Sequence, residues 1–169
     1  MENELYFISD LGAGSLYVMP KPPYIGLDTF IADLRQSGIK KIISLMEMDE
    51  ADQEGLSKEK QYCIDEGIQF EQFPIVDGHI PDIESFLSFF KKISDEICDG
   101  LSVVIHCWAG IGRSGLAACT LLHLNGIPML QAIEIVSEKR MFPVPETELQ
   151  YHFLKQVENT LGSTDRESK

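Results

Sequence analysis

The feature that most constrains the fold is a short apolar run that is followed at once by a glycine-rich turn and then by a helical pattern. The run spans residues 101–105, which is too short for a buried helix and predicts a central parallel strand. Other apolar runs predict strands at 16–19, 41–46 and 68–75. Amphipathic stretches predict helices at 27–36, 57–66, 83–99, 113–124, 128–139 and 147–161. This alternation predicts an α/β fold, with a central, mainly parallel sheet and helices on both faces.

The longest regular helix is predicted to follow Pro81 and Asp82, two residues typical of a helix start. Its apolar side chains recur at steps of three and four residues, so they form one buried face. They are Phe86, Leu87, Phe90, Ile93 and Ile97. Gly100 follows the predicted end of this helix.

Length and charge limit the classes of protein to which the chain can belong. Its 169 residues suffice for one hydrophobic core, so we expect a single domain at 1–161 and a polar tail at 162–169. Acidic residues outnumber Lys and Arg by 27 to 14, which gives a formal net charge of −13. Such a surface repels nucleic acid and anionic lipid, and no apolar run is long enough to span a bilayer. We expect a cytoplasmic monomer that binds neither nucleic acid nor membrane.

The four cysteines are Cys63, Cys98, Cys107 and Cys119, and their spacing shows no pairs. This pattern predicts neither a disulfide framework nor a structural zinc site, and it fits a reducing compartment. Cys107 differs from the other three because it directly follows the predicted central strand and precedes the glycine-rich turn.

Cys107 begins a segment that is suited to bind phosphate. Ligands of an open α/β sheet bind at the carboxyl ends of its strands, where Cys107 is expected. Gly110 and Gly112 allow the turn to curl with its backbone N–H groups inward, and the next helix adds the positive end of its dipole. Arg113 can donate two hydrogen bonds to one phosphate. This positive field favours the Cys107 thiolate, so the segment predicts a nucleophile that attacks phosphorus. The simpler alternative is a buried cysteine that only packs.

The segment from His106 to Gly115 reads HCWAGIGRSG and matches the pattern HCxxGxxR[ST]G. It resembles the protein tyrosine phosphatase superfamily, in particular kinase-associated phosphatase-like enzymes of the dual-specificity branch. The similarity extends over residues 14–20, 75–82 and 146–150. This resemblance implies the cysteine-phosphatase fold and hydrolysis of phosphomonoesters on a phosphorylated protein substrate, without a metal or other cofactor.

The resemblance also implies a role for each residue of the loop. Cys107 is the expected nucleophile, and Ser114 is expected to donate its hydroxyl to the Cys107 sulfur when the phosphocysteine is hydrolysed. His106 is expected to orient the loop through hydrogen bonds rather than to transfer protons. The expected phosphate-binding residues are Trp108, Ala109, Gly110, Ile111, Gly112 and Arg113.

Expulsion of an alkoxide or phenoxide needs a proton donor on a loop that faces the nucleophile. Asp77 lies 30 residues before Cys107 and next to Gly78, and its spacing resembles that of the acid in kinase-associated phosphatases. Asp82 is better explained by the first turn of the long helix. We therefore favour Asp77 as the general acid, although an Asp-Gly pair is also typical of a simple turn.

Three further features leave alternatives open. The related enzymes often carry a Gln-Thr-x-x-Gln segment after the loop, and here Glu146 takes the first position while Gln150 is retained. A carboxylate repels phosphate, so Glu146 is expected either to point away from the loop or to weaken the second step, the hydrolysis of the phosphocysteine.

Cys63 is either an ordinary helix thiol or a partner for a protective disulfide with Cys107. The acidic run at 47–51 either repels acidic substrates or is a solvated face.

The function predicted from the sequence is hydrolysis of phosphotyrosine, and also of phosphoserine and phosphothreonine, through a phosphocysteine intermediate. One alternative is an inositol phosphate or phosphoinositide phosphatase. It is disfavoured because the variable loop positions Trp108, Ala109 and Ile111 carry no charge. The other alternative is a phosphoresidue-binding pseudophosphatase, which usually lacks the cysteine, the arginine or the acid.

Overall fold

The computed structural model describes residues 4–167, and the side chains up to residue 164. The strands in this part of the chain are β1 (Tyr6–Leu11), β2 (Gly14–Met19), β3 (Lys41–Ser44), β4 (Gln69–Gln72) and β5 (Val103–His106). The helices are α1 (Leu27–Gln36), α2 (Met48–Gln53), α3 (Glu59–Asp65), α4 (Ile83–Cys98), α5 (Gly112–Leu124), α6 (Met129–Arg140) and α7 (Glu148–Glu167).

The strands form one sheet in the order β1-β2-β5-β3-β4, with β5 at its centre. β5 pairs in parallel with β2 and β3, and β3 pairs in parallel with β4. β1 lies at the edge and pairs antiparallel with β2. The prediction of a central, mainly parallel sheet is therefore confirmed, as is the strand predicted from the run at 101–105.

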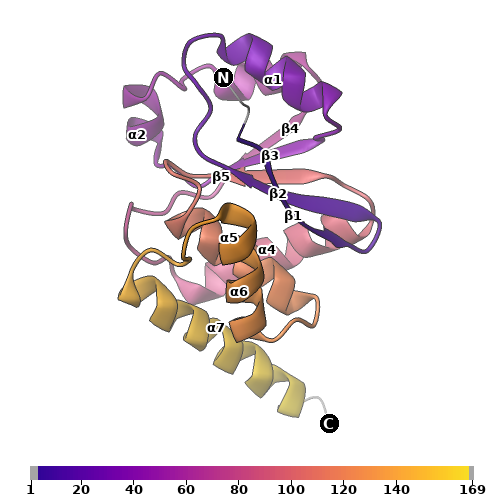
Figure 1. Cartoon of the computed structure of the whole chain (residues 1–169), viewed down its shortest axis with the longest axis vertical. Coiled ribbons are helices and arrows are strands. Elements are labelled where there is room, and N and C mark those ends of the chain that lie inside the picture. The colour runs from indigo at the N-terminus through magenta and orange to yellow at the C-terminus, as the bar shows by residue number, and fades with distance from the viewer. Residues whose placement is uncertain (1–3, 168–169) are drawn as a thin grey trace.

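Helices cover both faces of this sheet, as predicted. In Figure 1, α1 and α2 lie on one side of the sheet, and α4, α5, α6 and α7 lie on the other. Alternate side chains of β5 point to opposite faces. Val104 accordingly packs in a cluster with residues of α1 and α3, whereas Ile105 and Cys107 pack in the larger cluster with α4 to α7. Within residues 4–167, no helix is long and apolar enough to cross a bilayer.

The long helix α4 follows the predicted pattern closely. Asp82 is its N-cap, and the Asp82 side chain accepts a hydrogen bond from the Ser85 backbone N–H at 2.9 Å. All five apolar side chains predicted for the inner face are buried. Capping by a carboxylate and a continuous apolar stripe are both local signals, so the sequence is sufficient to predict this helix.

Besides shifts of one to three residues in the bounds of several predicted elements, such as the strand predicted at 68–75 that spans Gln69–Gln72, the structure differs from the prediction in three places. β1 was not predicted, because it is an edge strand in which only Ile8 and Leu11 are buried. The short helix α2 was not predicted either, because it buries no residue and is held by a capping box between Glu47 and Glu50. The last helix was predicted to end at 161, but α7 continues to Glu167.

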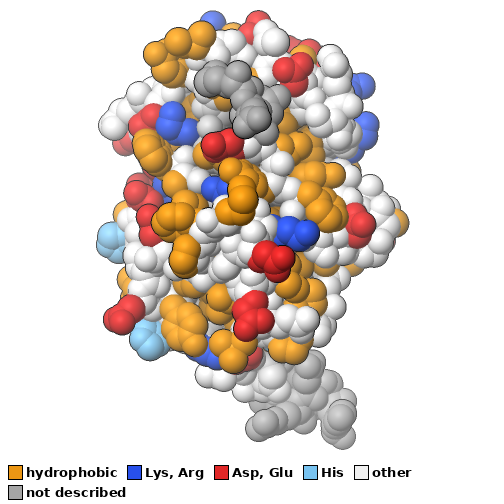
Figure 2. Space-filling model, in the orientation of Figure 1, with side chains coloured by type: hydrophobic (Ala, Val, Ile, Leu, Met, Phe, Trp, Pro, Cys, Tyr) orange, Lys and Arg blue, Asp and Glu red, His pale blue; other side chains and the backbone are white. Residues whose placement is uncertain are grey.

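The charged residues are distributed rather than gathered on the face that Figure 2 shows. There, single acidic and basic side chains are interspersed with hydrophobic groups. The net charge of −13 therefore does not concentrate in one block on this face. Residues 107–111 connect the end of β5 to the start of α5, and this connection, which we call the phosphate loop, holds the candidate site.

Candidate active site

Cys107 directly follows β5, at the carboxyl end of the central strand. Its side chain is buried, and its Sγ accepts a hydrogen bond from the backbone N–H of Gly110 at 3.3 Å. The phosphate loop therefore curls around the sulfur at Gly110, whereas Gly112, the second glycine of the predicted turn, is the first residue of α5. Gly110 has a φ of +69°, and a Cβ at this position would lie 2.5 Å from the Met19 carbonyl oxygen. Only glycine fits both the conformation and the space.

Arg113 lies in the first turn of α5 and is 1% exposed. Its Nη1 donates to the carbonyl oxygen of Ile75 at 2.9 Å and to Glu50 Oε2 at 2.8 Å, while Nη2 donates to Glu50 Oε1 at 2.7 Å. Nη2 also forms an ion pair with Asp77 Oδ1 at 3.2 Å. Arg113 Nε is buried and has no hydrogen-bond partner among the described residues.

The surroundings of Arg113 favour the charged form of its guanidinium. Burial disfavours its charged form, but the hydrogen bonds that Arg113 donates to Glu50 and the attraction of the neighbouring acidic groups, among them Glu50 and Asp77, outweigh this effect and raise the pKa of Arg113. The same contact lowers the pKa of Glu50, chiefly through the Arg113 hydrogen bond. The site thus combines a fixed cation with the buried Cys107 sulfur.

Glu50 is a site residue that the sequence analysis did not identify. The acidic run at 47–51 was interpreted as either a solvated face or a repulsive patch, and in the structure most of it forms α2. Glu50 takes part in the capping box of this helix through Oε2, which accepts from the Glu47 N–H at 3.2 Å, and it also binds Arg113. The capping-box spacing of Glu47 and Glu50 could have predicted the helix, but not the distant arginine.

The structure brings Asp77, and not Asp82, to Arg113. Asp77 and Gly78, whose φ is +73°, are the middle residues of a turn closed by the hydrogen bond from His79 N–H to the Val76 carbonyl oxygen. The Asp77 side chain is 72% exposed, and its Oδ1 faces Arg113. Asp82 instead caps α4, and hydrogen bonds from the Ser85 backbone and side chain lower the pKa of Asp82. Of the two candidate acids, Asp77 therefore has an exposed carboxyl group beside the Arg113 guanidinium, whereas that of Asp82 is engaged in capping α4.

The outer side of the phosphate loop is held by Arg140, which the sequence analysis also missed. Arg140 Nε donates to the carbonyl oxygen of Gly110 at 2.7 Å, and its Nη2 donates to that of Ala109 at 3.1 Å. Its guanidinium lies 3.7 Å from the centre of the Tyr6 ring, on β1. Carbonyl groups held on the outside of a loop leave its N–H groups to point inward, which is the geometry of an anion nest.

Trp108 lies half-exposed at the rim of the loop. Its indole N–H donates to Glu54 Oε1 at 3.0 Å, and Glu54 Oε2 forms an ion pair with Lys21 at 2.9 Å. Hydrogen bonds from Lys21 and then from Trp108 lower the pKa of Glu54. The indole is therefore oriented by polar contacts, with one part of the ring open to solvent.

Ser114 and Gln150 lie behind the loop and are fully buried. No hydrogen-bond partner of Ser114 Oγ lies within the described part of the chain. Gln150 Oε1 accepts from the backbone N–H groups of Glu146 and Thr147, at 3.2 and 3.3 Å. Glu146 does not point away from the loop, because a Cβ at Gly112 would lie 2.8 Å from its Oε2.

His106 and Cys63 lie on the opposite side of the sheet from Cys107. His106 contacts Glu59 and the Cys107 carbonyl oxygen through its two ring nitrogens. Cys63 packs in the cluster with α1, and burial, followed by the charge of Glu59, raises the pKa of Cys63 to about 12. Cys63 and Cys107 are both free thiols in different clusters, which favours the interpretation of Cys63 as an ordinary packed thiol.

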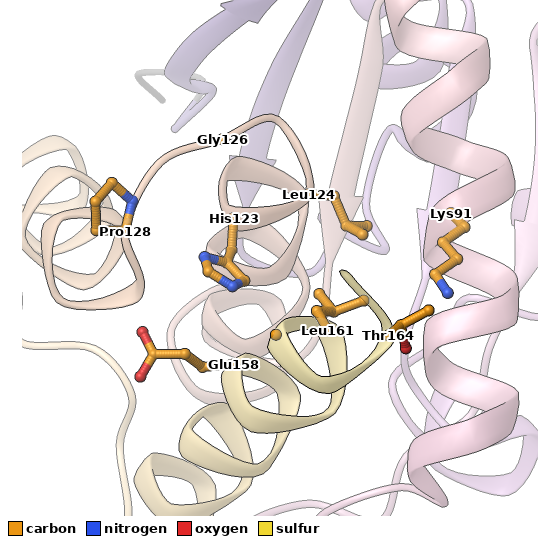
Figure 3. Close-up of a pocket in the computed structure, with 9 residues that line it drawn as sticks. Lys91, His123, Leu124, Gly126, Pro128, Glu158, Leu161 and Thr164 are labelled. Carbon is orange, nitrogen blue, oxygen red and sulfur yellow. The ribbon is translucent and has the colours of Figure 1, made fainter. Parts of the chain in front are cut away.

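A cavity of about 640 Å³ lies elsewhere, between α4, α5 and α7. Figure 3 shows Lys91, His123, Leu124, Leu161 and Glu158 around it. His123 and Leu124 end α5, whereas the phosphate loop precedes its first residue, so a helix length on the order of 20 Å separates the two. This cavity does not belong to the candidate active site. Within the described residues, no group of three or more His, Cys, Asp and Glu side chains could hold a metal ion.

The buried Cys107, the Arg113 guanidinium and the exposed Asp77 carboxyl group thus lie together at the carboxyl end of β5. Residues 23–126, more than half of the chain, match the family model described as Tc-R-P: Polymorphic toxin system, DSP-PTPase phosphatase. The chain therefore belongs to this family of dual-specificity and tyrosine phosphatases, and the sequence-based assignment to the superfamily is confirmed.

Individual relatives agree with this family. The chain is 35% identical over 98 residues to cyclin-dependent kinase inhibitor 3 of Mus musculus, covering 57% of this chain and 46% of the relative. The match thus spans about half the length of that relative. The chain is also 29% identical over 135 residues to protein tyrosine phosphatase type IVA 3 of Bos taurus, covering 77% of this chain and 72% of that relative. The crystal structure of kinase associated phosphatase with a substituted catalytic cysteine matches the fold, with a TM-score of 0.84, 23% identity and coverage of 94% and 95%.

Proposed function

We propose that this protein is a cysteine-dependent protein phosphatase that hydrolyses phosphotyrosine, and also phosphoserine and phosphothreonine, through a phosphocysteine intermediate. The observation that carries the proposal is the convergence of Cys107, Arg113 and Asp77. The thiol lies inside the phosphate loop, and Arg113 Nη2 lies 3.2 Å from the Asp77 carboxyl group. Membership of the dual-specificity and tyrosine phosphatase family supports the same chemistry.

In the first step, the loop N–H groups and Arg113 bind the phosphoryl oxygens, and the Cys107 thiolate attacks phosphorus. The S–P bond forms as the P–O bond to the leaving group breaks, and Asp77 gives its proton to the departing oxygen. In the second step, water attacks phosphorus while the Asp77 carboxylate takes its proton. The S–P bond breaks, and the Ser114 hydroxyl donates to the sulfur that is released.

A phosphoprotein fits the rim of the site better than a polyphosphorylated inositol does. Trp108 presents part of an aromatic face beside the cradle, where a tyrosine ring can pack. The nearby Lys21 is already paired with Glu54, at 2.9 Å, and Glu50 is already bound to Arg113. Additional phosphate groups on a substrate would meet these carboxylates, which repel them.

The test is turnover of a chromogenic aryl phosphate by the purified chain. We expect activity that vanadate blocks and that a chelator leaves unchanged. Cys107→Ser should abolish it, while the matched variant Cys98→Ser, at a half-buried helix cysteine, should retain it. Loss of activity with chelator, or full activity of Cys107→Ser, would contradict the proposal. A parallel panel of phosphotyrosine, phosphothreonine and inositol phosphate substrates then identifies the substrate class.

A further inference from the structure

The Trp108 indole is held at the rim of the phosphate loop by several contacts. Its N–H donates to Glu54 Oε1 at 3.0 Å, and Glu54 Oε2 forms an ion pair with Lys21 Nζ at 2.9 Å. Lys21 Nζ also lies 5.8 Å from the centre of the indole ring, and the Lys21 backbone N–H donates to the Trp108 carbonyl oxygen at 3.0 Å. Trp108 is thus held by its backbone, its ring nitrogen and a cation over its ring, yet half of the residue stays exposed.

Glu54 connects this ring to the helix that also holds the cation of the site. It is the C-cap of α2, and Glu50 of the same helix binds Arg113. Residues four positions apart lie on the same face of a helix, with Cβ atoms about 5–6 Å apart. The indole and the guanidinium are therefore bound to neighbouring carboxylates of one helix, which places the aromatic ring beside the phosphate-binding cradle.

The Glu54 carboxylate can serve both of its partners at once. Hydrogen bonds from Lys21 and then from Trp108 lower the pKa of Glu54, so its charged form is retained at neutral pH. This form accepts hydrogen bonds at both oxygens, one for the indole N–H and one for the ammonium group. The indole is therefore oriented over the whole neutral range.

We propose that Glu54 is a specificity-determining residue of this site, because it holds the Trp108 indole where the ring of an aryl phosphate packs. The inference rests on the proposed function and deepens it: the site favours phosphotyrosine over phosphoserine and phosphothreonine. In phosphotyrosine an aromatic ring carries the ester oxygen, whereas in phosphoserine a methylene group does. Packing of two aromatic rings is worth about two- to twelvefold in kcat/KM. Glu54 acts on the substrate only through the indole, so it is a positioning residue.

The first measurement is the ratio of kcat/KM for a phosphotyrosine peptide to that for a phosphoserine peptide of otherwise identical sequence. In Glu54→Ala the indole loses its acceptor, so we expect this ratio to fall at least twofold. Loss of one negative charge and release of the Lys21 ammonium group act on both phosphate groups alike, so these effects cancel in the ratio. Glu54→Gln keeps an amide oxygen that accepts from the indole and should retain most of the preference.

The second measurement needs no turnover, because Trp108 is the only tryptophan in the sequence and its fluorescence reports on the indole directly. In Glu54→Ala we expect lower fluorescence anisotropy and stronger quenching by acrylamide than in the wild type. Saturation of Cys107→Ser with a tryptophan-free phosphotyrosine peptide should change the emission more than saturation with its phosphoserine counterpart. Asp49→Ala, at an exposed position of α2, is the control for loss of one charge and should retain the wild-type ratio and anisotropy.

A double-mutant cycle tests whether Glu54 acts through the indole. In a Trp108→Leu background no ring is left to orient, so Glu54→Ala should leave the ratio unchanged. An equal fall of the ratio in both backgrounds, or a wild-type ratio in folded Glu54→Ala, would overturn the inference. If Glu54→Ala does not fold, Trp108→Phe, which keeps a ring but cannot donate to Glu54, decides by the same ratio.

Failure of the proposed function gives a different result from failure of this inference. Absence of turnover in the wild type would contradict the proposed function. The fluorescence titration of Cys107→Ser would then still decide the inference, because equal emission changes with the two peptides would overturn it.

Discussion

Replacing Glu50 by glutamine removes one of the two carboxylate oxygens that hold Arg113. The two hydrogen bonds, at 2.7 and 2.8 Å, join opposite charges, and the Arg113 side chain is buried while that of Glu50 is 21% exposed. A charge-assisted hydrogen bond of this kind contributes roughly 1.5–3 kcal/mol. In Glu50→Gln the amide oxygen keeps one bond and the amide N–H₂ faces the guanidinium. We therefore expect a loss of about 2 kcal/mol in transition-state binding, or about 30-fold in kcat/KM.

The assay is steady-state hydrolysis of an aryl phosphate, together with inhibition by vanadate, which occupies the same cradle. In Glu50→Gln, kcat/KM should fall and vanadate should bind more weakly, because both depend on the orientation of the Arg113 guanidinium. Asp49→Asn removes the same charge from an exposed position in the same helix and should leave both nearly unchanged. Equal losses in the two variants, or wild-type kinetics in folded Glu50→Gln, would refute the reasoning that the bidentate contact positions Arg113.

Three further predictions follow from the same contacts. Asp77→Asn should lower kcat on a phosphotyrosine peptide by roughly 10²-fold. Asp82→Asn should retain activity, because asparagine still caps the helix, and the reverse result would move the acid role to Asp82. Gly110→Ala should lower both thermal stability and turnover, since its Cβ would lie 2.5 Å from a backbone oxygen, and unchanged melting would contradict this. The Arg113 hydrogen bond lowers the pKa of Glu50, so this pair stabilises the fold above the unfolded pKa of about 4.3, and the stability is lost as pH falls through the lower folded value. Urea unfolding of Glu50→Gln between pH 6 and 3 should accordingly show a weaker pH dependence than that of the wild type.

Local patterns were sufficient to predict the part of the site that one segment supplies. Cys107, Gly110, Gly112 and Arg113 lie within a single strand-loop-helix unit. The position of each residue in this unit explains why a cysteine, a glycine or an arginine is found there. The same is true of Asp82, whose capping role follows from its position before an apolar stripe. The roles of these residues depend on neighbours a few positions away, which a sequence displays directly.

The remaining site residues contact the loop across long separations, and no local pattern reports such contacts. Glu50 lies 63 positions from Arg113, Glu59 lies 47 positions from His106, and Arg140 lies 30 positions from Gly110. Each is a single charged residue in or beside a short or polar helix, where the simplest expectation is a solvated side chain. Only the packing of the layers shows that their charges face inward, and the sequence could not have predicted it.

The set of donors on Arg113 has a consequence for the order of events. A guanidinium has five N–H groups. In Arg113 the four N–H groups of Nη1 and Nη2 face Glu50, the Ile75 carbonyl oxygen and Asp77, so only Nε–H has no partner among the described residues. An incoming phosphoryl group that takes two donors must therefore displace one of these acceptors, and the Asp77 carboxyl group, at 3.2 Å, makes the longest of the contacts. On the proposed function, displacement of Asp77 would join arrival of the ester and release of its proton donor in a single exchange.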